Sequence, residues 1–527
     1  MLNTKCIDLP PKVIELIFTH LREEWVPERE VVDPEEEITF RSGWMTFSHV
    51  YRSWREVALG ASLWAETTID IFSIHPHHIP AILERSQPSH LAIEAISEDP
   101  FDKISQDAGL HAWLSTHVLQ RVRSLTLEGE RGLYDLVVSR LPTNMDQLRE
   151  LSVTVDGADE IIILPALFAN LDCITMLWLE HCEIPWDAPI YSAQITYLHF
   201  RGTGFGPKRT FTEFIDLIER LPHLRSLGLL NFVPVQDTSS RIINLPSSFR
   251  FLEFIVTKEP IISDGLTFLS NLCAPPLCTR MIQLLNIPHK IASTSFFDST
   301  LRQLLSEIFV DNSDSGGLPA RHLGIYRDLV SVVYGGIQTQ PVHLQQIEIP
   351  TPKDAVENVI SLRSRDDKHS AALQCKAIGL SPEHMLQQLH RITIFGSIIC
   401  AMQEMNGWAP LLGAVNVHHI DVGHDPFELA SSDCAALLDV LSQVKTHAEG
   451  SDSKICFPHL EVLVFRLPKE ESDPEWINGV IDVVRVRKEQ GTPLREVYVS
   501  DYTAHWAVWD VIRDDVKVSS MPPVVVV

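Results

Sequence analysis

Residue types that could do chemistry are thinly scattered along this chain of 527 residues. The glycine-rich stretch Gly202-Thr203-Gly204-Phe205-Gly206 follows an expected strand and precedes an expected helix, which is the context of a phosphate-binding loop. It lacks the spacing of a dinucleotide fingerprint and the Gly-Lys-Ser/Thr of a P-loop. We interpret it as a turn between two structural repeats.

Histidines cluster twice, as His75, His77 and His78 and as His418 and His419. Neither cluster has a cysteine or carboxylate beside it at zinc-ligand spacing, so we expect a polar turn and a strand-edge pair. No nucleophile elbow or His-Glu-x-x-His helix occurs. We therefore expect no catalytic residues, no metal and no cofactor. An enzyme, such as a hydrolase, with a site assembled from distant strands is kept as an alternative.

The charge balance bears on the class of partner. Lys and Arg number 43 and Asp and Glu 69, a formal charge of -26, which argues against nucleic-acid and anionic-membrane surfaces. The densest basic spot, Arg485, Arg487 and Lys488, is expected on the solvated face of a helix. Residues 1–20 lack the pattern of a signal peptide, and no apolar run approaches the roughly 18 residues of a membrane helix. Nine dispersed cysteines indicate reduced thiols, and hence the cytoplasm and/or the nucleus.

Near the N-terminus, two helical patterns flank an acidic interruption. The first pattern follows Asp8 and a pair of prolines, which suit a helix start. The interruption, residues 22–43, is rich in glutamate and is predicted to be a solvated loop, with an acidic tether as the alternative. The second pattern runs from Trp44 to Leu59 and closes at Ser62-Leu63-Trp64. Apolar positions of the first helix are Val13, Ile14, Ile17, Phe18 and Leu21.

These segments together resemble the F-box of fungal F-box proteins. The family pattern is matched by Leu9-Pro10 before an aliphatic helix, then Val50-Tyr51-Arg52-Ser53-Trp54-Arg55, and then Ser62-Leu63-Trp64. The long acidic insertion departs from the compact family pattern. The resemblance implies a small helical module that docks on the linker subunit of a cullin-RING ubiquitin ligase. The contact residues that it implies are Leu9, Pro10, Val13, Ile14, Ile17, Phe18, Leu21, Val50, Trp54, Leu63 and Trp64.

A small module cannot bury all of this apolar surface within itself, so part of it should seek a partner. The alternative is that the first helix only caps the end of a repeat array.

Beyond residue 85, a triplet of apolar residues at positions i, i+3 and i+5 keeps returning. The middle residues of the early copies are 26, 26, 21, 29 and 25 positions apart, near the leucine-rich-repeat period of about 20–29 residues. Later intervals grow to 45 and 43. The copies are Val122/Leu125/Leu127, Leu148/Leu151/Val153, Ile174/Leu177/Leu179, Ile195/Leu198/Phe200, Leu224/Leu227/Leu229, Phe249/Leu252/Phe254, a weak Ile282/Leu285/Ile287, Leu344/Ile347/Ile349, Leu389/Ile392/Ile394, Val417/Ile420/Val422, Leu460/Leu463/Phe465 and Leu494/Val497/Val499, with a possible first copy at Leu91 and Ile93.

The triplets have strand periodicity, and amphipathic helical patterns such as residues 211–221, 437–444 and 476–484 lie between them. We therefore predict an α/β fold: a leucine-rich-repeat-like solenoid of parallel strands with crossover helices over residues 71–527, preceded by a small all-α F-box-like module over residues 1–70. This resembles the irregular repeats of many fungal F-box proteins, although the regular Asn of the family is missing. A compact doubly wound sheet is the alternative. Residues 255–340 are left poorly assigned.

Residues between the buried triplet positions should point to the concave face of the repeats. Aromatic and arginine side chains there would be the anchors for a protein target. They are Trp178, Glu180, Tyr197, His199, Arg201, Arg391, Thr393, Phe395, His419, Asp421, Arg466, Glu496 and Tyr498.

These observations predict a non-enzymatic, substrate-recognising adaptor of an SCF-type ubiquitin ligase. Its partners would be the linker subunit and an unknown protein target, and neither nucleic acid nor membrane. The alternative is a protein-interaction scaffold of leucine-rich-repeat type that never meets a ligase.

Overall fold

The computed structural model describes most of the chain, in segments separated by short gaps. They are residues 9–30, 39–49, 51–65, 68–97, 108–142, 145–156, 162–164, 168, 171–202, 209–237, 241–275, 278–308, 320–325, 329–334, 356–364, 367–405, 407–423, 432–445, 454–465 and 474–521. The chain divides into two compact units: unit 1 is Met1–Phe232 with Pro246–Ser248, and unit 2 is Val233–Leu245 with Phe249–Val527. Within the described residues, none of the helices has both the length and the apolar composition to cross a bilayer.

Unit 1 begins with a helical module. Its elements are α1 (Pro11–Glu24), β1 (Glu28–Glu30), β2 (Thr39–Arg41), the 3-10 helix η1 (Gly43–His49), α2 (Arg52–Ala58) and α3 (Ala61–Ala65). Pro11 stands in the first turn of α1, where its missing N–H costs nothing. The prediction of a loop over residues 22–43 is wrong in part, because β1 and β2 lie within that range and pair antiparallel. The module is therefore not purely helical.

The helix expected over residues 44–59 is also wrong. The 3-10 helix η1 and α2 are separate elements, and Gly43 explains where η1 starts. Gly43 has a φ of +49°, and a Cβ there would lie 2.5 Å from the carbonyl oxygen of Trp25. The next backbone N–H, of Trp44, donates to that same carbonyl at 2.8 Å. This close approach turns the chain and requires glycine.

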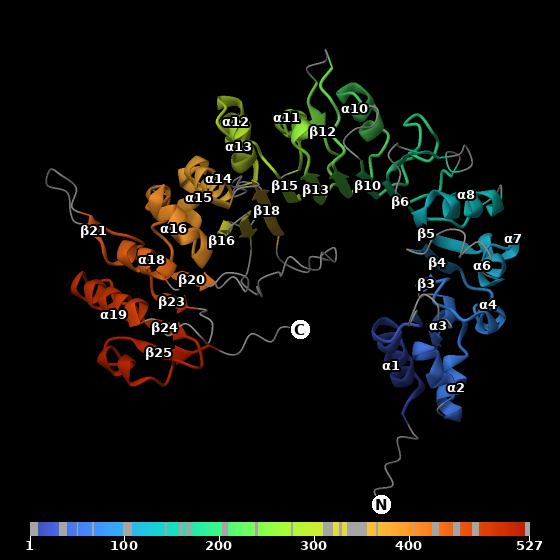
Figure 1. Cartoon of the computed structure of the whole chain (residues 1–527), viewed down its shortest axis with the longest axis horizontal. Helices are drawn as coiled ribbons and strands as arrows, with labels where there is room; N and C mark the ends of the chain where they lie inside the picture. Colours follow the sequence, from blue (N-terminus) through green and yellow to red (C-terminus); the bar gives the residue numbers. More distant parts are fainter. Residues whose placement is uncertain are drawn as a thin grey trace, which may run out of the picture. The chain divides into compact units, whose positions relative to one another are not determined.

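The remainder of unit 1 is a ladder of parallel strands (Figure 1). Its strands, each paired in parallel with the next, are β3 (Thr68–Asp70), β4 (Leu91–Ile96), β5 (Val122–Glu130), β6 (Glu150–Asp156), β8 (Met176–Glu180), β10 (Tyr197–Arg201) and β11 (Ser226–Leu230). The triplet residues lie in register, as Leu151↔Leu177↔Leu198↔Leu227 shows. They are at most 2% exposed, because each strand buries its row against its neighbours and the covering helices.

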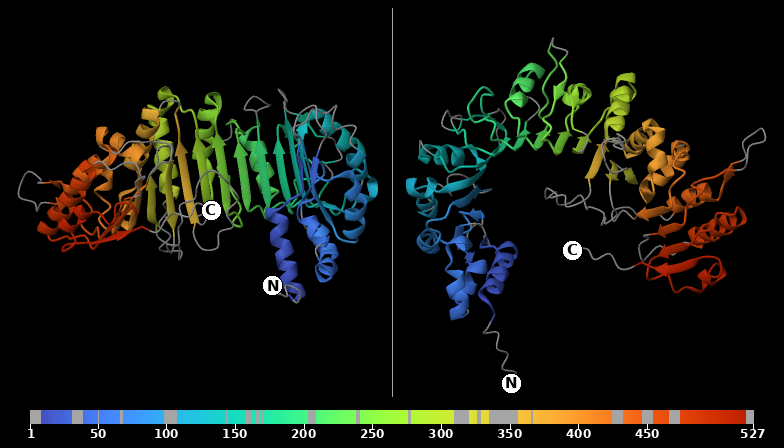
Figure 2. Two further views of the ribbon diagram at one scale, coloured as in Figure 1. Left: turned by 60° about the horizontal axis from the view of Figure 1, so that its bottom comes forward. Right: turned by 180° about the vertical axis from the view of Figure 1, so that it is seen from behind.

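Among the residues of unit 1 that the structure describes, the helices that connect the strands lie along one face of the ladder, and the other face, called here the helix-free face, carries none of them (Figures 1 and 2). The connecting elements are η2 (Pro76–His78), α4 (Ile79–Arg85), α6 (Ala108–Trp113), α7 (Thr116–Leu119), α8 (Arg131–Arg140), α10 (Phe211–Glu219) and the short parallel pair β7 (Ile162–Ile163) and β9 (Cys182–Glu183). The sequence dictates the start of α10, where Thr210 and Glu213 form a capping box.

Unit 2 repeats this arrangement with one interruption. Its strands are β13 (Phe251–Val256), β15 (Thr279–Leu284), β16 (Ala320–Ile325), β17 (Leu329–Tyr334), β18 (Val356–Leu362), β19 (Arg391–Phe395), β20 (His419–Gly423), β23 (Val462–Phe465), β24 (Glu496–Val499) and β25 (Lys517–Ser520). The pairs β13–β15–β18 and β16–β19–β20–β23–β24–β25 are parallel, whereas β17 lies antiparallel between β18 and β16. The expectation of uniformly parallel strands is wrong there.

Helices again lie on one face of the unit 2 sheet (Figure 2). The remaining elements are β12 (Ile243–Asn244), α11 (Glu259–Ser270), β14 (Leu272–Cys273), α12 (His289–Ala292), α13 (Ser295–Ile308), α14 (Asp367–Leu380), α15 (Glu383–Gln388), α16 (Gly396–Glu404), α17 (Trp408–Leu411), α18 (Ser432–Ser442), β21 (Val444–Lys445), β22 (Lys454–Ile455), α19 (Pro474–Glu489) and η4 (Ala507–Val511). Mixed α/β architecture with leucine-rich-repeat character is thereby confirmed. Gly491, with a φ of +75°, follows the last turn of α19, a conformation that favours glycine.

The weak triplet at Ile282, Leu285 and Ile287 is out of phase with the structure. Leu252 pairs with Arg280 and Phe254 pairs with Ile282, so the repeat position belongs to Arg280. Arg280 is 5% exposed, so a charged residue occupies a buried repeat position and the apolar pattern is broken there. The copy at residues 344–349 lies outside the described residues.

The prediction that Arg487 is solvated is also wrong. This side chain is fully buried rather than solvated, and its guanidinium donates to the carbonyl oxygens of Cys456 at 3.0 Å and Phe457 at 2.7 Å. Burial lowers its pKa to about 10, which still leaves it charged at neutral pH. Arg487 therefore ties α19 to the loop before β23 in the preceding repeat.

We expect Arg487→Met to destabilise the protein by about 2–5 kcal/mol, because two buried carbonyls lose charged donors. The measurement is the free energy of unfolding from urea titration followed by circular dichroism. Arg485→Met is the matched control, because Arg485 is exposed on the same helix, and it should change the free energy of unfolding by less than about 0.5 kcal/mol. Equal effects of the two substitutions would contradict this role of Arg487.

Candidate functional site

The N-terminal module has its own aromatic core. Phe18 of α1 is fully buried, with its ring centroid 6.3 Å from that of Phe47 and 6.0 Å from that of Trp54. Trp64 is 3% exposed, and its indole N–H donates to the carbonyl of Ala58. The residues that carry the sequence resemblance therefore hold α1, α2 and α3 together.

A second set of apolar side chains on the module faces outward. Leu9 and Val13 are each 38% exposed and Leu16 is 61% exposed. Val13 and Leu16 are three residues apart on α1, so they share a face of that helix, and Leu9 directly precedes it. Tyr51 and Leu59, at the two ends of α2, are also exposed. This uncovered surface, Leu9, Val13 and Leu16, is named the α1 surface.

The expected linker-binding residues thus fall into different groups. Ile14, Phe18, Leu63 and Trp64 are buried core residues, so their use as contact residues is corrected. Leu9, Pro10 and Val13 are exposed, and Ile17, Leu21 and Trp54 are half-buried. Val50 lies outside the described residues. Leu16 was not predicted, because it lies outside the apolar pattern of Val13, Ile14, Ile17, Phe18 and Leu21.

The helix-free face of unit 1 carries a row of aligned side chains. Register places Trp178 of β8 beside His199 of β10 and His199 beside Gly228 of β11. The Trp178 and His199 rings stack at 3.6 Å between centroids and 7° between planes. A Cβ at residue 228 would lie 2.0 Å from Nδ1 of His199, so only glycine leaves room for the imidazole.

Polar contacts extend this row. Tyr197 stacks beside Trp178 with a centroid distance of 6.4 Å. Arg201 Nη1 lies 2.8 Å from Oε1 of Glu180, and the side chains are 44% and 10% exposed respectively. The expected target residues of this unit therefore lie together, but Glu180 and His199 are buried. The accessible groups are Trp178, Tyr197 and Arg201.

Unit 2 carries a polar cluster on its own helix-free face. Arg391 Nη2 donates to Oδ2 of Asp421 at 2.9 Å, and both side chains are largely covered. His322 Nε2 lies 2.9 Å from the hydroxyl of Thr393. Burial and, secondly, repulsion from Arg391 lower the pKa of His322 to about 4. His322 was missed because it lies in the poorly assigned segment.

The other expected residues of unit 2 are dispersed along the same face. Phe395 lies over Gly423 of the next strand, where a Cβ would meet the ring at 2.9 Å. This repeats the fit of His199 over Gly228. His419 pairs with Arg391, and Tyr498 lies on β24. Glu496 accepts from Lys517 at 2.6 Å. Arg466 lies outside the described residues.

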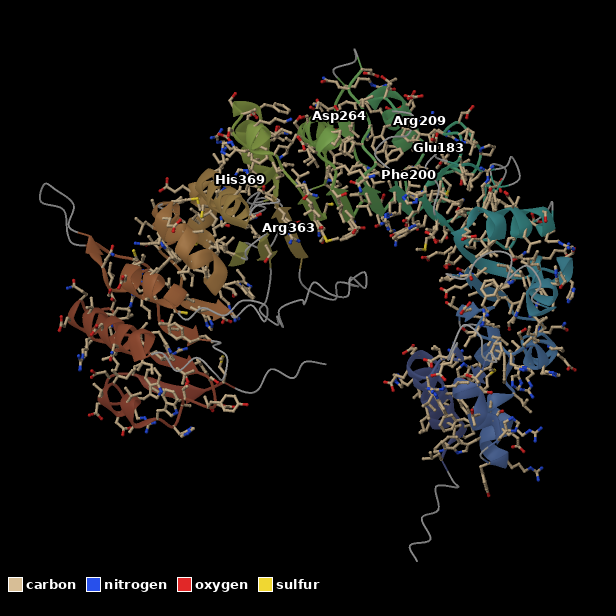
Figure 3. All side chains as sticks on the ribbon, viewed as in Figure 1. Glu183, Phe200, Arg209, Asp264, Arg363 and His369 are labelled. Atoms are coloured by element: carbon tan, nitrogen blue, oxygen red, sulfur yellow. The ribbon has the colours of Figure 1, made fainter. Side chains whose placement is uncertain are left out.

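Other polar groups that could suggest chemistry have structural surroundings. His75, His77 and His78 lie at the 3-10 turn η2, where His75 caps the turn. In unit 1, Glu183 and Arg209 form an ion pair on the helix side of β10, above Phe200 (Figure 3). Arg209 also lies 5.4 Å from the ring centroid of Trp186. Among the residues that the structure describes, no three His, Cys, Asp or Glu side chains are grouped to hold a metal ion.

His199 makes a testable contribution to pH dependence. Burial and, secondly, Arg201 lower its pKa from 6.5 to about 3. An unfolded histidine gains its proton near pH 6.5, whereas His199 stays neutral in the fold, so folding stability falls as pH decreases below 6.5. We expect this histidine alone to remove about 2 kcal/mol between pH 6.5 and pH 5.

The check is urea unfolding at pH 7 and pH 5. His199→Phe should shrink the difference between the two free energies of unfolding, because the ring remains and the titrating nitrogens are gone. His459→Phe, at an exposed histidine, is the control and should leave the difference unchanged. An unchanged difference in His199→Phe would show that residue 199 is not buried as a neutral imidazole.

Two known proteins resemble this chain, one over a short segment and one at low similarity. No protein-family model matches the chain. The disease resistance protein RML1A of Arabidopsis thaliana is 27% identical over 172 residues, which is 29% of this chain and 16% of that protein, so the chain spans about a sixth of the relative's length. The structure of a leucine-rich-repeat protein of Leptospira interrogans matches with a TM-score of 0.27 and 10% identity, over 84% of this chain and 98% of the other. A TM-score this low carries no argument. The leucine-rich-repeat character therefore follows from this chain's own strand register and buried triplets.

Proposed function

We propose that the chain is a substrate-recognition subunit of a cullin-RING ubiquitin ligase. Residues 1–70 would bind the linker subunit as an F-box-like module, and residues 71–527 would bind a protein target on the helix-free faces of the repeats. The observation that carries the proposal is that some apolar residues at α1 are buried and others are exposed. Phe18 and Ile14 build a core, while Leu9, Val13 and Leu16 leave apolar surface in water.

Exposed apolar side chains grouped on one helix favour a protein contact, because their removal from water stabilises a complex. The Leu-Pro, the Trp54 position and the Ser-Leu-Trp ending of the resemblance supply the class of partner. The net charge of -26 supports a basic rather than an acidic target surface.

Trp178, Tyr197 and Arg201 support target binding on the unit 1 face. Their side chains are the types that dominate protein interfaces, and Trp178 is held in place by its stack on His199. A rigid aromatic side chain loses little conformational entropy when it binds. The chain would then act without a catalytic site, by holding the target near the ligase so that a lysine meets ubiquitin at raised effective concentration.

The test is co-purification of the intact chain with the linker subunit. We expect Leu9→Ala/Val13→Ala/Leu16→Ala to weaken linker binding at least about tenfold, because lost interface contacts of this kind cost roughly 1.4 kcal/mol or more. The fold should be unchanged, since the three side chains are exposed. Affinity is measured by surface plasmon resonance.

The control is Ile163→Ala/Ile242→Ala/Val511→Ala, which truncates three apolar side chains that are 71%, 59% and 55% exposed elsewhere. It should bind the linker as the intact chain does. If the folded intact chain does not bind the linker, the ligase role is wrong and the repeats act as a protein-interaction scaffold. Phe18→Ala is unsuitable as a binding test, because it removes a core ring at a cost of about 3–5 kcal/mol.

A further inference from the structure

A cavity of about 270 Å³ opens in unit 1 where the N-terminal module meets the first repeats. The module contributes Trp44, Met45 and Trp64 to its lining, and the repeats contribute Asp70 and Glu94. Both parts belong to the same compact unit.

Two indoles form its apolar wall. Trp44 and Trp64 are 6% and 3% exposed, and their ring centroids are 4.9 Å apart at an interplanar angle of 55°. Trp64 already accepts a cation on its ring, because the guanidinium carbon of Arg85 lies 4.7 Å from the centroid. Arg85 itself does not line the cavity. Both indoles are among the residues that line the cavity.

The charged groups in the lining are all acidic. Glu28, Asp70 and Glu94 come from three different strands, and no Lys, Arg or His is among the lining residues. Asp70 is partly satisfied, because the Phe72 N–H donates to it at 3.1 Å and the Ser73 hydroxyl also donates. Arg29 further lowers its pKa by attraction, although burial raises that pKa more.

Glu94 is the less compensated of the two central carboxylates. The Glu94 backbone carbonyl accepts from the Ile71 N–H at 2.9 Å, but in the described part of the chain its carboxylate has no such hydrogen bond. Burial, followed by repulsion from Asp70 and Glu128, raises its pKa. A carboxylate in this position would be stabilised by a cation that enters the cavity.

We infer that the cavity binds an alkylammonium group, the lysine side chain of a target or its methylated form, between the indoles and the Glu94 carboxylate. Indole faces attract ammonium groups, and desolvation strengthens the attraction. An apolar stem would pack on Met45 and Ile82, which are 8% and 3% exposed. The inference rests on the proposed function in one respect: the lysine would belong to the protein target of the ligase.

The first experiment is calorimetric titration of the full chain with choline, with n-butylammonium and with 3,3-dimethylbutan-1-ol, the neutral isostere of choline. We expect at least one of the ammonium ions to bind at least about tenfold more tightly than the alcohol, because the cation–π term is worth about 1–2 kcal/mol in a desolvated site. The relative affinities of choline and n-butylammonium distinguish a methylated from an unmethylated lysine. Equal binding of cations and alcohol, or no binding of any, would overturn the inference.

The second experiment uses matched substitutions. Glu94→Gln should weaken ammonium binding about tenfold or more while preserving shape. Glu253→Gln is the control, because burial also raises the pKa of Glu253 but it does not line the cavity. Unchanged affinity in Glu94→Gln, or equal loss in both variants, would refute the site. Linker co-purification of Glu94→Gln separates this outcome from failure of the ligase proposal, because the α1 surface is intact in that variant.

Discussion

One constraint shapes the whole chain: no single strand–helix repeat can bury its apolar residues by itself. Leu177, Leu198 and Leu227 are completely buried because parallel pairing places each directly beside the next. The energy of this burial grows with each added neighbour, so stability is distributed along the ladder. Strands whose triplets are in register are the consequence. Each candidate site lies on the strands of its own unit or, in unit 1, in or beside the N-terminal module.

Arginine side chains join consecutive repeats to one another. Arg121 donates to the carbonyl oxygens of Ser86 and Ser89, both at distances of 2.8–2.9 Å. Arg220 donates to the carbonyls of Trp186 and Ala188 at 2.6 and 2.8 Å, and Arg487 makes the equivalent contacts near its own strand. In each case a guanidinium satisfies loop carbonyls of the preceding repeat, which otherwise would lose hydrogen bonds on burial.

On the helix-free faces, a large side chain on one strand lies beside a glycine on the neighbouring strand. His199 lies over Gly228 and Phe395 lies over Gly423, so a large ring on one strand depends on a missing side chain on the next. This fixes the orientation of Trp178 beside His199 and leaves aromatic surface in a defined place. In the N-terminal module, apolar residues of one helix also differ in burial: Phe18 is in the core, whereas Val13 is exposed and could contact a partner.

The sequence by itself determined the repeating strands. The three buried residues of each triplet are all apolar and lie at fixed spacing within the triplet, so a periodic apolar pattern is enough to locate them. Ten of the copies, from Val122 to Val499, coincide with a described parallel strand. It also located helices α10 and α19, because amphipathic periodicity is a local pattern. The antiparallel strand β17 and Arg280 in a leucine's place were not predictable, since both depend on neighbours far along the chain.

The tertiary structure alone decided which candidate residues are available. Ile14 and Val13 are adjacent and both apolar, yet one is 1% and the other 38% exposed, a difference set by how α2 packs on α1. His199 and Asp421 are covered although their strand positions face away from the helices. The cavity between Trp44, Trp64 and Glu94 joins residues some fifty positions apart. Periodicity states which face a side chain occupies, but burial and proximity depend on what the rest of the chain places against it.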